Sequence, residues 1–255
     1  MRVDLRPPSD ATHQPIPAGQ STTAGIRISL LSRFELSSEG RHLPVPFSVE
    51  RLIAFLALHD GSLLRPYVAG VLWPETAEVR AGANLRSSLW RVRRTGYPVI
   101  FATGNSLRLS AEVAVDLREL LATIRMVFDS SQDPPIPALQ QLLHARDLLP
   151  GWYEDWVLLE RERVRQLRLH ALEALCERLT DRGRFGAAVE AGLAAVAGEP
   201  LRESAHRALI RAHLVEGNQG EAIRQYQRYC RLVHDELRLK PSRQMHDLVA
   251  GLGLR

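Results

Sequence analysis

The sequence predicts a mainly α-helical protein with a small amount of β structure near its N-terminal end. Short apolar runs separated by turn residues indicate strands within residues 26–45 and 99–109. Beyond position 138 the apolar residues follow helical spacing almost throughout, and they repeat with a period of 34 residues. We therefore expect a small mixed domain over residues 25–111 and an all-α domain over residues 112–255. A disordered arm at residues 1–24 is expected to precede them.

Positive charge is concentrated in the first half of this 255-residue chain. Residues 1–110 hold 13 basic and 8 acidic side chains, which gives a charge of +5, whereas residues 111–255 hold 20 basic and 21 acidic side chains. This asymmetry indicates a polyanionic partner for the N-terminal domain. Of the 33 basic residues 32 are arginine, a bias that we attribute to a GC-rich coding sequence.

The sequence gives no support to several functional classes. Cys176 and Cys230 lie on separate helical patterns without a CxxC motif or a Cys/His cluster. We therefore expect both to be buried, and we expect neither a metal site nor a cofactor. No apolar run approaches the roughly 18 residues of a membrane span, and the N-terminus lacks the apolar core of a signal peptide. We expect a cytoplasmic protein with no membrane partner.

Three short strands are expected at the start of the first domain. Ile26–Leu31 and Phe34–Leu36 are apolar-rich runs. Leu43–Val45 is a third candidate, which Pro44 would place at a sheet edge. The segment Ser38–Gly40 is predicted to be a turn between strands.

Three helices are predicted next. The first is Val49–His59, with Ser48 as its N-cap and Gly61 as its stop. The second is Arg65–Leu72, and the third is Glu78–Arg94.

The third helix carries the strongest functional signal in the chain. Between Val79 and Ala111 there are six arginines and no acidic residue. Leu85, Leu89 and Val92 lie within about 60° of one another on a helical wheel, so they are expected to form the core stripe. The residues expected to project away from the core are Arg80, Ala83, Ser87, Arg91 and Arg94, with Asn84 on the flank and Arg86 and Arg93 toward the core edge.

A hairpin is expected to follow this helix. Val99–Phe101 and Leu107–Leu109 are the predicted strands, and Thr103–Asn105 is the turn between them. A small sheet, three helices and a basic hairpin together predict a winged helix-turn-helix, in which the hairpin is the wing. The major groove of DNA is about 12 Å wide and admits one helix, so short polar side chains on the third helix would contact base edges while arginines contact phosphates. The predicted DNA-contact residues are Arg80, Asn84, Arg86, Ser87, Arg91, Arg93, Arg94, Thr103, Asn105 and Arg108.

The second domain is predicted to consist of paired helices. Asp116 is expected to cap a helix that runs to about Phe128, and residues 129–137 are expected to form a linker. A shift of 34 residues aligns alanines and turn glycines of the later helices, which is the tetratricopeptide pattern. The aligned pairs are Ala171 with Ala205, Leu175 with Leu209, Gly183 with Gly217 and Ala188 with Ala222.

Repeat helices need neighbours to bury their apolar faces. We therefore expect about three helix pairs, the first of them formed by Leu139–Leu149 and Trp156–Leu169. A final helix is expected over Ser242–Leu252.

Both halves together resemble the SARP-type antibiotic regulatory proteins, which join an OmpR-type winged helix to a bacterial transcriptional activation domain with tetratricopeptide-like repeats. The resemblance covers about residues 26–250. It rests on Leu52–Leu58, Leu72–Pro74, Asn84–Arg86, Val92–Arg94, Val115–Leu117, Gly183, Ala188, Glu199–Glu203, Gly217, Ala222, Tyr226 and Leu239–Pro241.

The resemblance implies a transcriptional activator of a biosynthetic gene cluster. It implies binding to direct repeats in promoter double-stranded DNA as a side-by-side homodimer, and recruitment of RNA polymerase through its sigma factor. Two departures concern the hairpin: Leu107 precedes Arg108–Leu109 where the family has tyrosine, and the turn after the third helix is short.

The sequence leaves two alternatives to DNA binding. In the first, the protein is a repeat-based adaptor whose winged helix contacts protein. In the second, it is an enzyme, but no nucleophile with a positioned base is visible, and the sole lysine, Lys240, is not in a phosphate-binding loop. The repeat domain could also hold a ligand or peptide near Trp152, Tyr153 and Trp156, although core packing is the simpler interpretation of this aromatic cluster.

Overall fold

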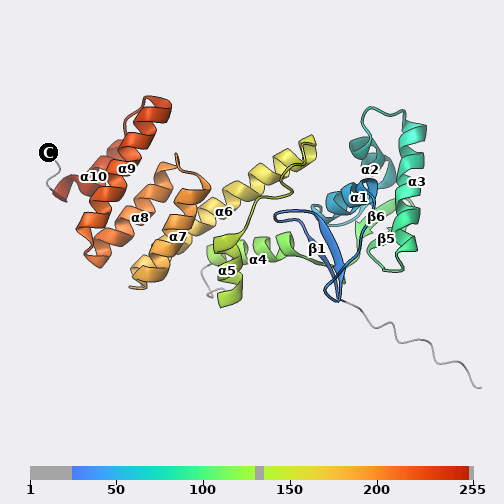
Figure 1. Ribbon diagram of the computed structural model, residues 1–255, viewed down its shortest axis with the longest axis horizontal. Coiled ribbons are helices and arrows are strands. Elements are labelled where there is room, and N and C mark those ends of the chain that lie inside the picture. Colours follow the sequence, from blue (N-terminus) through green and yellow to red (C-terminus); the bar gives the residue numbers. More distant parts are fainter. Residues whose placement is uncertain (1–24, 130–134, 253–255) are drawn as a thin grey trace, which may run out of the picture.

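The computed structural model describes residues 25–129 and 135–252, so the expected N-terminal arm and most of the expected linker lie outside the described residues. Figure 1 shows an elongated molecule with the helix α3 at one end and the helix α10 at the other. Strands are found only in the N-terminal part of the described chain, and the rest is helical. The predicted fold class, mainly α with a small β content, is confirmed.

A four-stranded sheet opens the described chain. Its strands are β1 (Ile26–Ser29), β2 (Glu35–Ser38), β3 (Arg41–His42) and β7 (Ala114–Val115), in the order β3-β2-β1-β7, with β7 parallel to β1. The turn between β2 and β3 is confirmed, since residues 39 and 40 have φ angles of 50° and 75°. The prediction of a strand at Leu43–Val45 was wrong, because the third strand is β3, two residues earlier; beyond it the Leu43 N–H still donates to the Leu36 carbonyl at 2.8 Å, but residues 43–45 form no strand.

Three helices follow, and two of them have the predicted bounds: α2 (Arg65–Leu72) and α3 (Glu78–Arg94). The helix α1 (Phe47–Ala57) begins earlier than predicted, and Ser48 is not its cap. The Pro46 carbonyl instead accepts the backbone N–H groups of residues 49 and 50, at 2.8 and 3.1 Å. Pro46 has the extended ψ and the fixed φ that suit the position before a helix, and no side chain caps this end. Gly61 does not end the helix, which stops four residues before it.

The wing is larger than predicted. It consists of β4 (Leu63–Leu64), β5 (Ile100–Thr103) and β6 (Ser106–Leu109), in the order β4-β6-β5. Residues 103 and 106 are paired, which leaves a two-residue tip at Gly104–Asn105. The strand β4 was not predicted, because a two-residue run gives no periodic signal and is defined only by its pairing with distant β6.

Asp116 connects the sheet to the helices beyond it. It begins the helix α4 (Asp116–Asp129), and its carboxylate accepts the backbone N–H groups of Leu30 at 2.9 Å, Leu31 at 3.1 Å and Leu117 at 2.7 Å. Burial raises the pKa of Asp116, and the three N–H donors oppose that rise. Asp116 was predicted only as a cap, but its main contacts lie 85 and 86 residues away in sequence.

The remaining described helices are α5 (Ile136–His144), α6 (Asp155–Asp181), α7 (Phe185–Gly198), α8 (Glu203–Glu216), α9 (Gln219–Leu237) and α10 (Arg243–Val249). The pairs α6–α7 and α8–α9 form the predicted repeat, and both turn glycines, Gly183 and Gly217, have positive φ. A Cβ on Gly192 would come within 3.1 Å of Leu209, so this glycine permits the close approach of α7 to α8.

The expected additional helix pair at Leu139–Leu149 and Trp156–Leu169 is wrong. The first segment ends at residue 144, and the second continues without a break into the repeat as the 27-residue helix α6. This stretch contains no glycine or proline that would end a helix. The predicted final helix is shorter, because α10 ends at residue 249 and a 3₁₀ turn follows, while Ser242 caps its start.

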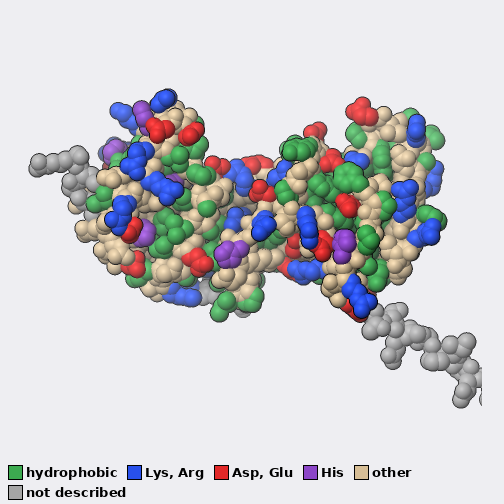
Figure 2. All heavy atoms as spheres, in the orientation of Figure 1, with side chains coloured by type: hydrophobic (Ala, Val, Ile, Leu, Met, Phe, Trp, Pro, Cys, Tyr) green, Lys and Arg blue, Asp and Glu red, His purple; other side chains and the backbone are tan. Residues whose placement is uncertain are grey.

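Aromatic packing joins the winged helix to the repeat helices. Trp156 packs edge-on against Phe55 at 5.3 Å between ring centroids, and Trp152 packs against Phe47 at 5.2 Å. Core packing of these two tryptophans is therefore confirmed, whereas Tyr153 is 78% exposed. Arg51 and Glu154 form a 2.9 Å ion pair across the same junction. In Figure 2 the surface is notched between the winged helix and the start of α6, with hydrophobic side chains on both walls.

The cysteines differ from each other in burial. Cys176 is buried, as predicted, but Cys230 is only half-buried. The prediction that both are buried is therefore correct for one of them.

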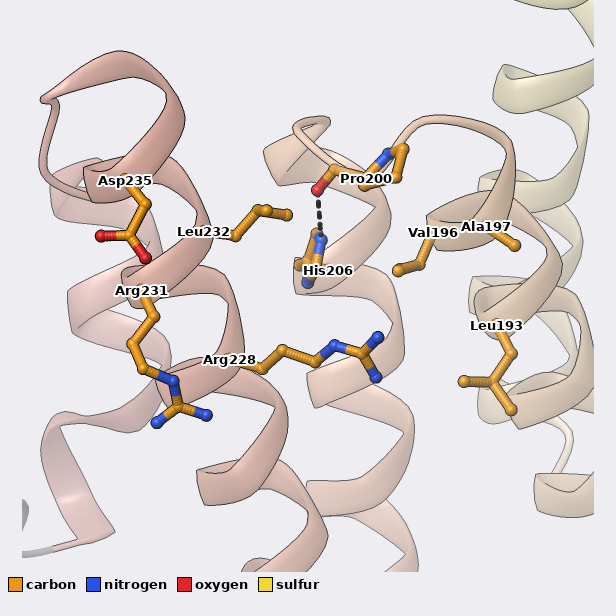
Figure 3. Close-up of a pocket in the computed structure, with 9 residues that line it drawn as sticks. All are labelled: Leu193, Val196, Ala197, Pro200, His206, Arg228, Arg231, Leu232 and Asp235. Carbon is orange, nitrogen blue, oxygen red and sulfur yellow. Dashed lines mark hydrogen bonds between the residues drawn. The ribbon is translucent and has the colours of Figure 1, made fainter.

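A groove of about 470 Å³ lies between α7, the start of α8 and α9 (Figure 3). His206 lies in its floor, with Nε2 2.9 Å from the Pro200 carbonyl and Nδ1 2.8 Å from the Gln225 amide nitrogen. Because a carbonyl only accepts, Nε2 carries the proton and Nδ1 accepts from Gln225, so the ring is neutral. Burial lowers the pKa of His206, and nearby Arg228 lowers it further.

Replacing Asp116 by asparagine should lower the free energy of unfolding by about 1–3 kcal/mol. Both carboxylate oxygens accept backbone N–H groups, whereas an amide has only one accepting oxygen. Denaturant unfolding followed by circular dichroism measures this loss of stability. Asp60→Asn is the matched control, since the Asp60 side chain is 96% exposed. Equal stability of the two variants would contradict the role given to Asp116.

His206 should make the protein less stable below about pH 6.5. Its folded-state pKa is lowered, so the unfolded chain binds more protons, and the stabilisation present above the unfolded pKa of 6.5 is lost as pH falls. The free energy of unfolding, measured between pH 7.5 and pH 5, should fall less steeply with falling pH for His206→Gln than for the wild type. The exposed His42→Gln serves as control. A slope for His206→Gln equal to the wild-type slope would refute the assignment.

Candidate nucleic-acid interface

One stripe of α3 is buried and the opposite face is open. Ala81, Leu85, Leu89 and Val92 are buried, together with Ser88, where the helix packs against α1 and α2. The predicted core stripe is therefore confirmed. Figure 1 shows α3 along the outer edge of the molecule, on the side away from the repeat helices. Its outer face is thus accessible along the whole length of the helix.

The predicted contact residues of α3 lie on this accessible side. All are exposed except Asn84, which is half-buried. Figure 2 shows basic side chains spaced along the edge that α3 forms. The residues concerned are Arg80, Asn84, Arg86, Ser87, Arg91, Arg93 and Arg94.

These arginines are not neutralised within the described chain. In residues 25–129 and 135–252, no carboxylate lies within ion-pair distance of any of the five helix arginines or of Arg108. Arg91 donates only a long hydrogen bond, 3.3 Å, to the Ser48 hydroxyl. By contrast, many arginines of the repeat helices pair with carboxylates, as Arg165 does with Glu162 and Arg202 does with Glu173. The α3 face therefore presents uncompensated positive charge.

The wing places the remaining predicted residues beside α3. Thr103 and Asn105 are exposed at or next to the hairpin tip, and Arg108 is half-buried on β6. Asn105 and Arg86 line the same small cavity of about 240 Å³, between the tip, α2 and α3. The structure therefore brings Asn105, at the tip of the wing, next to Arg86 of α3.

Arg65 fixes the wing in this position, a role that no sequence pattern indicated. Its Nε donates to the Gly104 carbonyl at 3.1 Å, and its backbone N–H donates to the Asn105 carbonyl at 2.9 Å. The first residue of α2 thus holds the tip of the wing. Only the unpredicted pairing of β4 with β6 brings these residues together, so the contact depends on segments that are distant in sequence.

Two exposed aromatic side chains on this surface were also missed. Trp90 on the outer face of α3 is 56% exposed, and Phe101 on β5 is exposed as well. Each lies under a guanidinium group: Arg94 is 4.8 Å from the centroid of Trp90, and Arg108 is 4.5 Å from that of Phe101. Such cation–π contacts are modest at exposed sites, but they fix the direction of both arginines.

The surface is suited to binding a polyanion. Unpaired guanidinium groups donate in a fixed planar geometry that matches phosphate oxygens and guanine edges.

Among the described residues, no group of His, Cys, Asp and Glu is placed to hold a metal ion. Within the same part of the chain, no helix has the length and apolar character that crossing a bilayer requires.

Comparison with known proteins gives a family match in the second half of the chain and one similar regulatory protein. Residues 130–252 match the family model of the bacterial transcriptional activator domain. The regulatory protein AfsR of Streptomyces coelicolor is 29% identical over 91% of the chain. The chain spans only 24% of the length of that relative.

A solved structure shows the same fold. The structure of EmbR from Mycobacterium tuberculosis, in complex with a low-affinity phosphopeptide, matches with a TM-score of 0.65 at 18% sequence identity. The match covers 88% of this chain and 64% of EmbR, and at this identity it is evidence for the fold alone. Residues 130–252 thus match the bacterial transcriptional activator domain, and the chain is similar to the regulatory protein AfsR, in line with the resemblance to SARP-type regulatory proteins that the sequence suggests.

Proposed function

We propose that the protein is a sequence-specific, DNA-binding transcriptional activator. The observation that carries the proposal is the outer face of α3, which holds five exposed arginines without carboxylate partners in the described chain. An α-helix with its side chains is about 10–12 Å across, which matches the major groove of about 12 Å. Binding of duplex DNA would supply the phosphate partners that the arginines lack.

The contact residues are assigned different tasks. Asn84, on the flank of the outer face, and Ser87 and Arg91 would contact base edges. The other arginines of α3 would contact phosphates on either side of the groove. The wing would reach the neighbouring groove with Thr103, Asn105 and Arg108. Arg65 would position the wing without needing to contact DNA itself.

The second domain would carry the activating contact. The bacterial transcriptional activator domain at residues 130–252 and the similarity to AfsR support recruitment of RNA polymerase, through its sigma factor, to promoters of a biosynthetic gene cluster. Two copies would bind side by side on direct repeats. We place the boundary between the DNA-binding and activating parts at residues 111 and 112, immediately before β7 and α4. The aromatic packing of Trp152 and Trp156 would hold both parts in one orientation.

Neutralising two arginines should weaken DNA binding and make it less dependent on salt. For the double variant Arg91→Ala/Arg94→Ala we expect affinity to fall tenfold or more at moderate salt. The slope of log K against log salt should decrease by about one for each phosphate that the variant no longer neutralises. Fluorescence anisotropy with duplexes selected from a random library measures both quantities.

The matched control is Arg243→Ala, because Arg243 is almost fully exposed on α10, at the far end of the molecule. Its affinity and salt slope should equal those of the wild type. Unchanged binding by the α3 double variant would contradict the assignment of these arginines. Failure of the wild type to select any duplex would contradict DNA binding and favour a protein-contacting adaptor.

A further inference from the structure

The outer face of α3 is not uniformly polar. Val79, Ala83 and Trp90 lie along its centre, at positions i, i+4 and i+11. All three are exposed, Val79 at 85% and Trp90 at 56%. Arginines flank this apolar strip on both sides. We infer that Trp90 is a specificity-determining residue, which recognises thymine by packing its indole against the 5-methyl group in the major groove. The inference rests on the proposed function.

The exposed ring of Trp90 does not contribute to the hydrophobic core of the described fold. Its helix is already anchored by the buried stripe on the opposite side, and the ring is not part of the core. An exposed indole on a face that otherwise attracts water is therefore better explained by a ligand that covers it.

The indole ring of Trp90 leans from its Cα toward the middle of α3. Side chains in an α-helix lean toward its N-terminus, so the indole covers the turn that holds Arg86 and Ser87. Arg94, one turn later, lies over the ring at 4.8 Å and limits its movement from the other side. The indole thus occupies the part of α3 that would lie deepest in the groove.

The chemistry of the groove identifies what an apolar ring can recognise there. Guanine presents two acceptors, cytosine presents a donor, and adenine presents one of each. Thymine alone presents an apolar group, the 5-methyl, and burying it against an indole removes apolar surface of both from water. Trp90 should therefore favour thymine at one position in each half-site.

The test is a two-by-two comparison of protein and DNA. Wild-type protein and Trp90→Ala are each used to select duplexes from a random library, and affinities are then measured by anisotropy. At the position where the wild type selects thymine and Trp90→Ala does not, thymine is replaced by uracil. Uracil, carried in the duplex by deoxyuridine, lacks only the methyl group. The affinity of the wild type should fall about three- to fivefold, the amount expected for one buried methyl, and that of Trp90→Ala should not change.

Two control variants separate this effect from others. Tyr153→Ala removes an exposed aromatic side chain from the opposite side of the domain junction and should leave the thymine preference unchanged. Arg94→Ala should lower affinity for all sequences and reduce the salt slope. Circular dichroism of Trp90→Ala should equal that of the wild type, because the ring is outside the core.

The possible failures are distinguishable. If Trp90→Ala selects the same thymines as the wild type, or is weakened as much by removal of the methyl, the inference is overturned while DNA binding stands. If Trp90→Ala weakens all sequences equally, Trp90 contacts the backbone and the inference is again overturned. If the wild type binds no duplex selectively, both the proposed function and this inference fail.

Discussion

The buried stripe on α3 is the constraint on which the rest of the interface depends. A helix that buries Leu85, Leu89 and Val92 against α1 and α2 has only one orientation about its axis. That orientation turns the arginines outward at no further cost, because they fall at positions that the stripe leaves exposed. Mutual repulsion of these cations is tolerated because all of them face water. The charge of the face thus follows from the packing of its opposite side.

The wing and the repeat helices are placed relative to α3 by few contacts. Arg65 joins the tip of the wing to the first residue of α2, and Asp116 joins the end of β1 to the start of α4. Phe55 packs on Trp156 at the junction of the two domains. These contacts connect the α3 face to the repeat helices through packed side chains, and no exposed linker is interposed in the described part of the chain. A DNA-bound winged helix would therefore hold the activator domain in a defined direction.

Local patterns in the sequence predicted much of the fold and the exposure of most candidate contact residues on α3. The bounds of α2 and α3 followed from an apolar stripe and from clear stop signals, and the turn glycines at 183 and 217 followed from the repeat. The start of α1 was missed because its N-cap residue is Pro46 and no capping side chain marks this end. The single helix α6 was divided in two because the repeat pattern suggested a break that the residues themselves do not encode.

The strand β4 and the contacts of Arg65 and Asp116 depend on partners far away in sequence. Trp90 was not predicted as a site residue, because a single apolar residue on a cationic face carries no charge signal.

Cross-linking from the centre of the α3 face to DNA shows whether this face enters the major groove. Ala83→Cys, in a Cys230→Ser background that leaves only the buried Cys176, would carry a photoactivatable azide, and the labelled protein would be irradiated on a selected duplex. Leu193→Cys on α7, exposed on the repeat domain, would be the control. Cross-links are expected from position 83 to bases through the major groove, and none from position 193. Equal cross-linking from both positions, or none from position 83 in a bound complex, would contradict the placement of α3 in the groove.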